Sequence, residues 1–170
     1  KETWTGKTIR FNNFNESNGV VKDTLSGFDR FATYNYNASI TTKLYGIVNF
    51  KPEKRIQSIR HTITPSITYS NNPSFEEYYD TYIIDAEGNT TEYTRFQGGL
   101  YGTPSKGYSS SIGISIQNTL EAKVKPKDST QTELKKINIL KNLNISTSYN
   151  LAADEFNLSP IRITGSIDLA

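Results

Sequence analysis

The chain has 170 residues, 35% of them hydrophobic, and a formal net charge of +2 from 19 basic and 17 acidic side chains. The absence of cysteine excludes a disulfide framework and thiolate metal sites, and no run of about eighteen apolar residues is present to form a transmembrane helix. The basic residues are scattered among Ser, Thr and Asn, so the sequence gives no support to nucleic-acid binding.

The first segment predicts a strand over residues 1–11, although its alternation is too weak to assign faces. It carries Trp4, the only tryptophan, as either an interfacial anchor or an ordinary packed aromatic residue. The segment begins without Met and without the basic and apolar regions of a signal peptide, so we expect a mature product or an internal fragment. Residues 12–30 are rich in Asn, Ser, Gly and Asp, and predict a long loop.

The clearest predicted strand covers residues 33–50. Its even positions, from Tyr34 to Phe50, are mostly apolar and its odd positions mostly polar. A period of two is typical of a strand with one dry and one wet face. Strands of soluble domains average about five or six residues, whereas a tilted strand that crosses a bilayer needs about nine to eleven. The pattern therefore predicts a transmembrane β-barrel strand.

Four further strands are predicted at about residues 58–70, 110–124, 135–152 and 159–170, separated by polar turns. Leu140 and Lys141 interrupt the alternation of the third of these. Residues 71–107 predict a long loop that contains a β-hairpin over about 78–97, with Gly88 at a turn position that needs positive φ. Pro65 removes a ladder donor, which indicates either a weak point between strands or, as we favour, a bulge or an edge position.

These segments predict an all-β fold, in which residues 1–170 form a single partial domain. We expect an antiparallel meander of long amphipathic strands that belongs to a transmembrane outer-membrane β-barrel. The residues expected to face lipid are Tyr34, Tyr36, Ile40, Leu44, Val48, Ile63, Ile67, Ile112, Ile114, Ile116, Ile145 and Ile163. The charged residues expected to face the lumen are Lys43, Arg60, Glu121, Lys123 and Arg162, which either bind anionic headgroups or a plug protein, or simply form a solvated wall.

No catalytic, cofactor or metal site is predicted, and we do not expect an enzyme. His61 is the only histidine, and no cysteine or second histidine accompanies it as a catalytic or metal-binding partner. The segment from Asp85 to Asn89 faintly resembles a calcium loop, but it lacks the later bidentate Glu. A hairpin tip is the favoured interpretation of that segment.

Several longer motifs resemble the barrel domain of the LptD family of lipopolysaccharide-assembly outer-membrane proteins, in its divergent, cysteine-poor branch. The resemblance extends from Val20 to the end of the chain. The motifs are TTKLYGIVNF ending at Phe50, IRHTITPSITYS from Ile59 to Ser70, RFQGGLYGTPSKG from Arg95 to Gly107, NTLEAKV from Asn118 to Val124, and NISTSYNLAADEFNLSPIRITG from Asn144 to Gly165.

This resemblance implies a barrel that receives lipopolysaccharide from a periplasmic bridge protein and inserts it into the outer leaflet of the outer membrane. It also implies a lipoprotein that plugs the lumen. We expect the chain to be an internal slice of such a barrel, since no jellyroll domain and no closing strand is recognisable. Two alternatives stay open: another outer-membrane barrel, such as a porin or nutrient receptor, and a secreted β-sandwich adhesin or carbohydrate-binding module.

Overall fold

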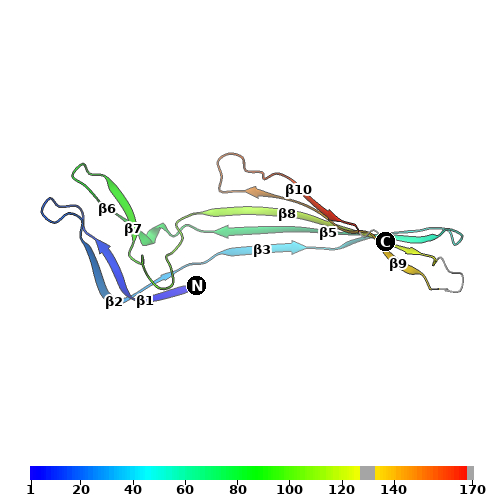
Figure 1. Cartoon of the computed structure of the whole chain (residues 1–170), viewed down its shortest axis with the longest axis horizontal. Helices are drawn as coiled ribbons and strands as arrows, with labels where there is room; N and C mark the ends of the chain where they lie inside the picture. The colour runs from blue at the N-terminus through cyan, green and yellow to red at the C-terminus, as the bar shows by residue number, and fades with distance from the viewer. Residues whose placement is uncertain (127–132, 168–170) are drawn as a thin grey trace. The chain divides into compact units, whose positions relative to one another are not determined.

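The computed structural model describes residues 1–126 and 133–167, and it is an all-β protein with antiparallel sheets (Figure 1). The chain, expected as one domain, divides into two compact units. Unit 1 comprises Lys1–Tyr36 and Asn71–Ser109, and unit 2 comprises Asn37–Ser70 and Ser110–Ala170. Within the described residues, no helix has the length and apolar character needed to cross a membrane.

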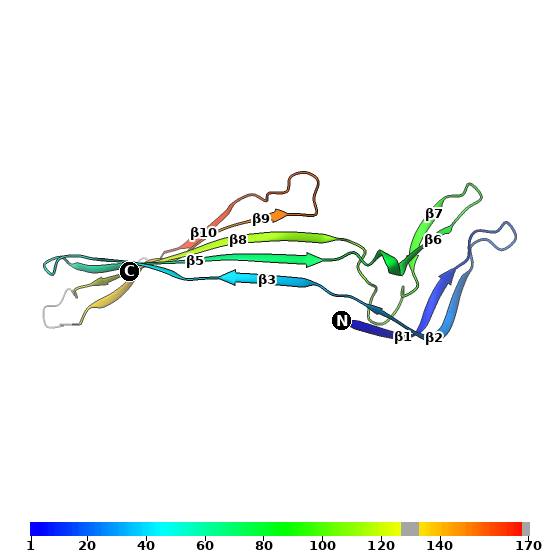
Figure 2. The same cartoon turned by 180° about the vertical axis from the view of Figure 1, so that it is seen from behind.

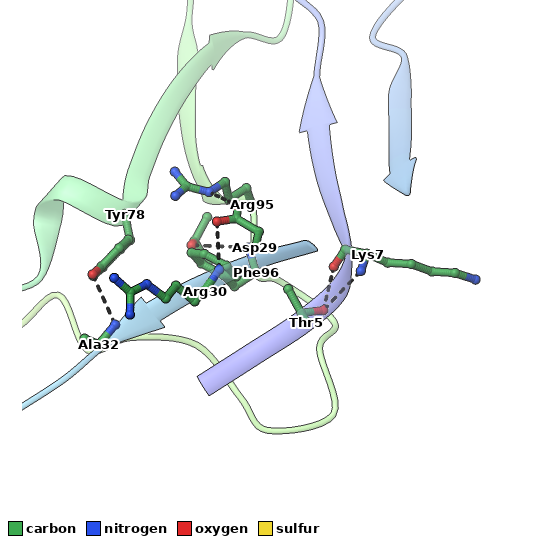
Figure 3. Close-up of polar contacts among 9 residues, drawn as sticks. Thr5, Lys7, Asp29, Arg30, Ala32, Tyr78, Arg95 and Phe96 are labelled. Atoms are coloured by element: carbon green, nitrogen blue, oxygen red, sulfur yellow. Dashed lines mark hydrogen bonds and ion pairs between the residues drawn. The ribbon is translucent and has the colours of Figure 1, made fainter. Parts of the chain in front are cut away.

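Unit 1 contains two antiparallel hairpins. One pairs β1 (Glu2–Phe11) with β2 (Lys22–Ala32), and the other pairs β6 (Tyr79–Ile83) with β7 (Thr90–Thr94) after a short 3-10 turn, Glu76–Tyr78. The turn between β6 and β7 places Gly88 at φ 84°. In β1, a bulge lies between Thr5 and Lys7, where the Thr5 hydroxyl donates to the Lys7 carbonyl at 2.8 Å (Figure 3).

The prediction of a long loop over residues 12–30 was wrong for its second half, because β2 begins at Lys22. Most side chains of this strand are exposed, including those of Leu25 and Phe28. Alternation of apolar and polar residues arises when one face of a strand is buried. Because most side chains of β2 are exposed, its sequence lacks this alternation and resembles that of a loop. It is held instead by its backbone pairing with β1 and by the Trp4–Phe28 ring contact, with centroids 5.1 Å apart.

The two hairpins of unit 1 share an aromatic core. Its buried members include Ile9, Phe31, Tyr93 and Phe96. Backbone bonds join the hairpins directly, since the Ile9 amide donates to the Arg95 carbonyl at 2.9 Å. Unit 1 therefore has a packed core, which is held by backbone hydrogen bonds and ring contacts between segments that are distant in sequence.

Polar contacts at the edge of that core fix β2 against the end of β7 (Figure 3). Arg95 Nε donates to Asp29 Oδ2 at 2.7 Å, and the Arg95 guanidinium lies 4.8 Å from the centre of the Phe96 ring. The Ala32 amide donates to the Tyr78 hydroxyl at 3.1 Å. A charge-assisted bond with a cation–π contact orients Arg95 more tightly than either contact alone.

Unit 2 is built on one sheet with the strand order β10-β9-β8-β5-β3, in which β4 also pairs with β5 (Figure 2). The strands are β3 (Tyr36–Thr41), β4 (Leu44–Asn49), β5 (Ile56–Asn72), β8 (Ser109–Val124), β9 (Lys135–Asn150) and β10 (Arg162–Ser166). The last strand was expected over 159–170, of which residues 168–170 lie outside the described part of the chain.

The strand expected over residues 33–50 forms as two strands, β3 and β4, because Pro65 lies opposite the gap between them. Thr42 donates its amide to the Pro65 carbonyl at 3.2 Å, but Pro65 has no N–H to return the bond. The register continues unchanged into the pair Leu44–Ile63. The edge position considered for Pro65 was therefore wrong, since β5 is an internal strand.

The interruption at Leu140 and Lys141 corresponds to a β-bulge region in β9. Asn118 pairs with Leu143, Leu120 with Leu140 and Glu121 with Asn138, so β9 uses two more residues than β8 over this stretch. Each extra residue shifts the following side chains to the other face. The shift brings Leu140 opposite Leu120, and apolar pairing continues through the break in the sequence pattern.

Candidate functional site

One face of the unit 2 sheet carries rows of apolar side chains from successive strands. Ile163 pairs with Ile145 and Ile145 pairs with Ile116, so three isoleucines from β10, β9 and β8 lie side by side. Directly paired residues of antiparallel strands point to the same face. Ile163 is 64% exposed and Ile40 is 77% exposed. The apolar rows thus form an uncovered hydrophobic surface within the described chain.

Most residues expected to face lipid lie in strands of this sheet. Leu44 pairs with Ile63 and Val48 with Ile59, while Ile112 pairs with Tyr149 and Ile114 with Thr147. Ile67 is in β5 and Ile40 in β3. Tyr36 is the first residue of β3 and Tyr34 precedes that strand, and both belong to unit 1, where the Tyr34 ring lies 5.4 Å from both the Tyr36 and Phe75 rings.

The opposite face of the same sheet is polar. Side-chain hydroxyls pair across β3 and β5, with Ser39 and Thr68 at 3.1 Å and Thr41 and Ser66 at 2.9 Å. Farther across the sheet, Ser115 pairs with Ser146, and Ser146 pairs with Arg162. Hydroxyl and amide side chains on a surface of this kind can hydrogen-bond to water or to a polar ligand.

A cluster of charges lies on this polar face, where β5, β8 and β9 meet. Glu121 accepts from Arg60 Nε at 2.9 Å and from Arg60 Nη2 at 2.5 Å, and its other carboxylate oxygen lies 2.6 Å from Lys136 Nζ. Lys123 is directly opposite Lys136 in the strand pairing. One carboxylate therefore bridges two cations, and a third cation lies next to them.

The charge cluster lines a cleft of about 400 Å³, together with Ile47, Asn49, Ser58 and Ala122. Three cations and one carboxylate give its ionisable groups a net charge of +2. Among the described residues, Lys123 forms no ion pair. Guanidinium and ammonium groups on a polar surface are suited to phosphate and carboxylate ligands, so the cleft has the chemistry of an anion-binding surface.

The structure brings together three of the five charged residues expected to face the lumen, namely Arg60, Glu121 and Lys123. Lys43 lies in the gap between β3 and β4, and Arg162 lines a separate, smaller cleft with Ser146 and Ser159. The sequence analysis missed Lys136. The alternation with Ile137 could have placed this residue on the polar face, because the two register shifts of β9 cancel, but its pairing with Lys123 depends on the register between β8 and β9.

The other candidate residues have structural roles. His61 Nε2 lies 3.1 Å from Asn118 Oδ1, across β5 and β8. Asp85 accepts from the Asn89 amide and side chain at 2.9 and 2.7 Å, which closes the hairpin turn. These donors lower the pKa of the Asp85 carboxyl, mainly through the Asn89 side chain. The described residues contain no group of three or more His, Cys, Asp or Glu side chains placed to hold a metal ion.

A comparison with protein families identifies the family of the chain. The family model LptD_2, described as LptD protein, matches residues 1–170, which is the whole chain. No curated protein matches the chain, and no solved structure matches it.

Proposed function

Because this chain belongs to the LptD family, a family that handles lipopolysaccharide at the outer membrane, we propose that it forms part of a barrel wall. In this proposal the barrel spans the outer membrane and inserts lipopolysaccharide into the outer leaflet. The unit 2 strands contribute to the wall, with the apolar face toward lipid and the polar face toward the lumen.

The observation that carries the proposal is the pair of opposite faces on one sheet of long strands. β5 has 17 residues, and β8 and β9 have 16 each. A strand that crosses a bilayer needs about nine to eleven residues, so these strands can span it and project beyond it. A β-sandwich would cover its apolar face with a second sheet, whereas the described residues of unit 2 form a single sheet.

The physical need for such a wall follows from the amphiphilic cargo. Each methylene exposed to water costs about 0.8 kcal/mol, so a molecule with several acyl chains does not cross water unaided at a useful rate. A polar lumen accommodates its sugars and phosphates. The charge cluster around Glu121 supplies cations suited to the phosphates, and the hydroxyls of the polar face are suited to the sugars.

Two protein partners belong to the same proposal. A lipoprotein that plugs the lumen would lie against the polar face, and a periplasmic bridge protein would deliver the lipopolysaccharide. The outer-membrane bilayer would cover the apolar rows, which are uncovered in the described chain.

Depletion of the parent protein in living cells tests this function. We expect newly labelled lipopolysaccharide to remain in the inner membrane and periplasm, measured by membrane fractionation after a short pulse of labelled sugar. Re-expression of the wild-type protein should restore delivery to the outer membrane. Depletion of a general porin in the same strain is the matched control.

The opposite result would favour the alternative outer-membrane barrels. Normal delivery of lipopolysaccharide together with lost uptake of a small solute would contradict the proposal and indicate a porin or nutrient receptor.

A further inference from the structure

We propose that unit 1 carries a binding site for a neutral oligosaccharide. The site is a pocket of about 560 Å³, formed by the segment after β2, the segment after β5 and the loop that precedes β8. Its volume lies within the range of roughly 300–1,000 Å³ typical of small-ligand sites. The proposal goes beyond lipopolysaccharide transfer and does not depend on it.

Four aromatic residues line the pocket. Phe31 and Phe75 are buried, whereas Tyr34 is 54% exposed and Tyr101 is 66% exposed. The Tyr34 ring meets the Phe75 ring edge to face, with centroids 5.4 Å apart and planes at 89°, and it also contacts Tyr36. The exposed Tyr34 ring is therefore held in place by its neighbours before any ligand arrives.

The wall that carries Tyr101 is also fixed by contacts within unit 1. Gly102, at φ 76°, donates its amide to the Gly99 carbonyl at 3.3 Å and forms the turn next to Tyr101. Pro104 is fully buried, and its carbonyl accepts from the Tyr79 hydroxyl at 2.6 Å. A pocket bounded by fixed segments loses little conformational entropy when a ligand binds.

Polar side chains of the lining are free to bind a ligand. Thr33, Asn35, Thr103 and Ser105 line the pocket, and their side chains form no hydrogen bond within the described part of the chain. Hydroxyl and amide groups both donate and accept hydrogen bonds, as sugar hydroxyls also do. The lining thus offers unpaired hydrogen-bonding groups beside exposed aromatic faces.

The chemistry of the lining selects a neutral sugar over other ligands. No Asp or Glu lines the pocket, and the single charged lining residue among those described is Lys1. An anion would need a cluster of cations, and an acyl chain would need a continuous apolar wall. A sugar ring has an apolar C–H face to pack on Tyr34 or Tyr101 and hydroxyls at its edge for the polar side chains.

A second hollow extends the aromatic surface. It has a volume of about 200 Å³, shares Phe31 and Tyr101 with the first pocket, and is also lined by Trp4 and Leu100. Because Tyr101 lines both hollows, a ligand with several sugar units can contact it from each of them. This arrangement favours an oligosaccharide over a single sugar.

The test uses the purified full-length protein in a detergent without a sugar headgroup, because maltoside or glucoside headgroups would compete. The probes are maltotriose, cellotriose and mannotriose, with trigalacturonate as the acidic comparison. A fifth probe is the polysaccharide released from the cell's own lipopolysaccharide. Comparing its binding with that of the free trisaccharides shows whether the ligand is a glycan of the cell surface or a free oligosaccharide. Binding is measured by isothermal titration calorimetry and by saturation-transfer NMR.

We expect at least one neutral probe to bind and trigalacturonate to bind more weakly. Tyr34→Ala and Tyr101→Ala should each weaken binding about tenfold or more, whereas Tyr101→Phe should retain it, because the stacking face is kept. Phe156→Ala and Tyr45→Ala remove exposed rings outside the pocket and are the matched controls.

Three outcomes would overturn the proposal: no binding by any neutral probe, preference for the acidic probe, or equal loss in the control variants. The circular dichroism spectrum and the unfolding midpoint of each variant show whether it is folded. If an alanine variant is unstable, Tyr101→Phe still tests the proposal. Saturation transfer from this variant to a bound neutral sugar must match the transfer from the wild-type protein.

Discussion

Arg60 and Glu121, which are 61 residues apart in sequence, form a two-point ion pair across β5 and β8 on the polar face of the sheet. Lys136 binds the other carboxylate oxygen of Glu121 and extends the contact to β9. A single carboxylate thus connects three neighbouring strands through their side chains. The arrangement has measurable consequences for the stability of the sheet.

We expect Glu121→Gln to lower the free energy of unfolding of the parent protein by about 1 kcal/mol or less, because partly exposed ion pairs are worth about that much. Urea unfolding in detergent measures it, and Glu155→Gln is the control. A double-mutant cycle with Arg60→Gln should give a positive coupling energy. A coupling energy of zero would show that the two-point contact adds nothing to stability.

The proposed orientation of the sheet predicts unequal costs for charges on its two faces. Ile114→Arg should destabilise the protein in lipid by about 2–4 kcal/mol if Ile114 lies near mid-bilayer, because Arg on a lipid-facing position is costly there. Ser115→Arg, one residue away on the polar face, should cost much less. Equal penalties in a lipid-vesicle unfolding experiment would contradict the proposed facing.

Pro65 predicts a local weakness between β5 and the β3–β4 segment. Pro65→Val supplies the missing N–H opposite Thr42, so we expect the free energy of unfolding to rise by about 0.5–1.5 kcal/mol. Hydrogen exchange of the Thr42 amide should slow in parallel. Ile67→Val, on the same strand, is the control for the change in side-chain volume. Unchanged exchange at Thr42 would show that the proline does not weaken this pairing.

The hairpin turn at Asp85 should be sensitive to acid. The Asn89 donors lower the pKa of its carboxyl below the ordinary value of an aspartate, so the folded turn favours the ionised form. The stabilisation is therefore present above the pKa of the unfolded chain and is lost as pH falls through the lowered value. We expect the Asn89 amide resonance in NMR spectra to titrate in that acidic range, and Asp85→Asn to abolish the titration. A titration that survives in the variant would contradict this origin.

The strong alternation of residues 33–50 and 110–124 was enough to predict the all-β class, because a period of two leaves few other structures. The charge cluster was only partly predictable. Lys136 alternates with Ile137 and so belongs to the polar face, but its position opposite Lys123 depends on the register with β8, which the chain's own pattern does not contain. β2 escaped prediction for a related reason, since its stability comes from β1 and from aromatic contacts rather than from a buried face.

The central claim is that the polar face of the unit 2 sheet lines the route of lipopolysaccharide, and photocrosslinking during a pulse–chase tests it most directly. A photoreactive residue is placed at Ser115 on the polar face or at Ile114 on the apolar face, in the full-length protein in living cells. We expect pulse-labelled lipopolysaccharide to crosslink at Ser115 early and to disappear from that position during the chase, while any crosslink at Ile114 appears later and persists as the outer leaflet fills. Absence of a transient crosslink at Ser115, with lipopolysaccharide still reaching the surface, would contradict the account.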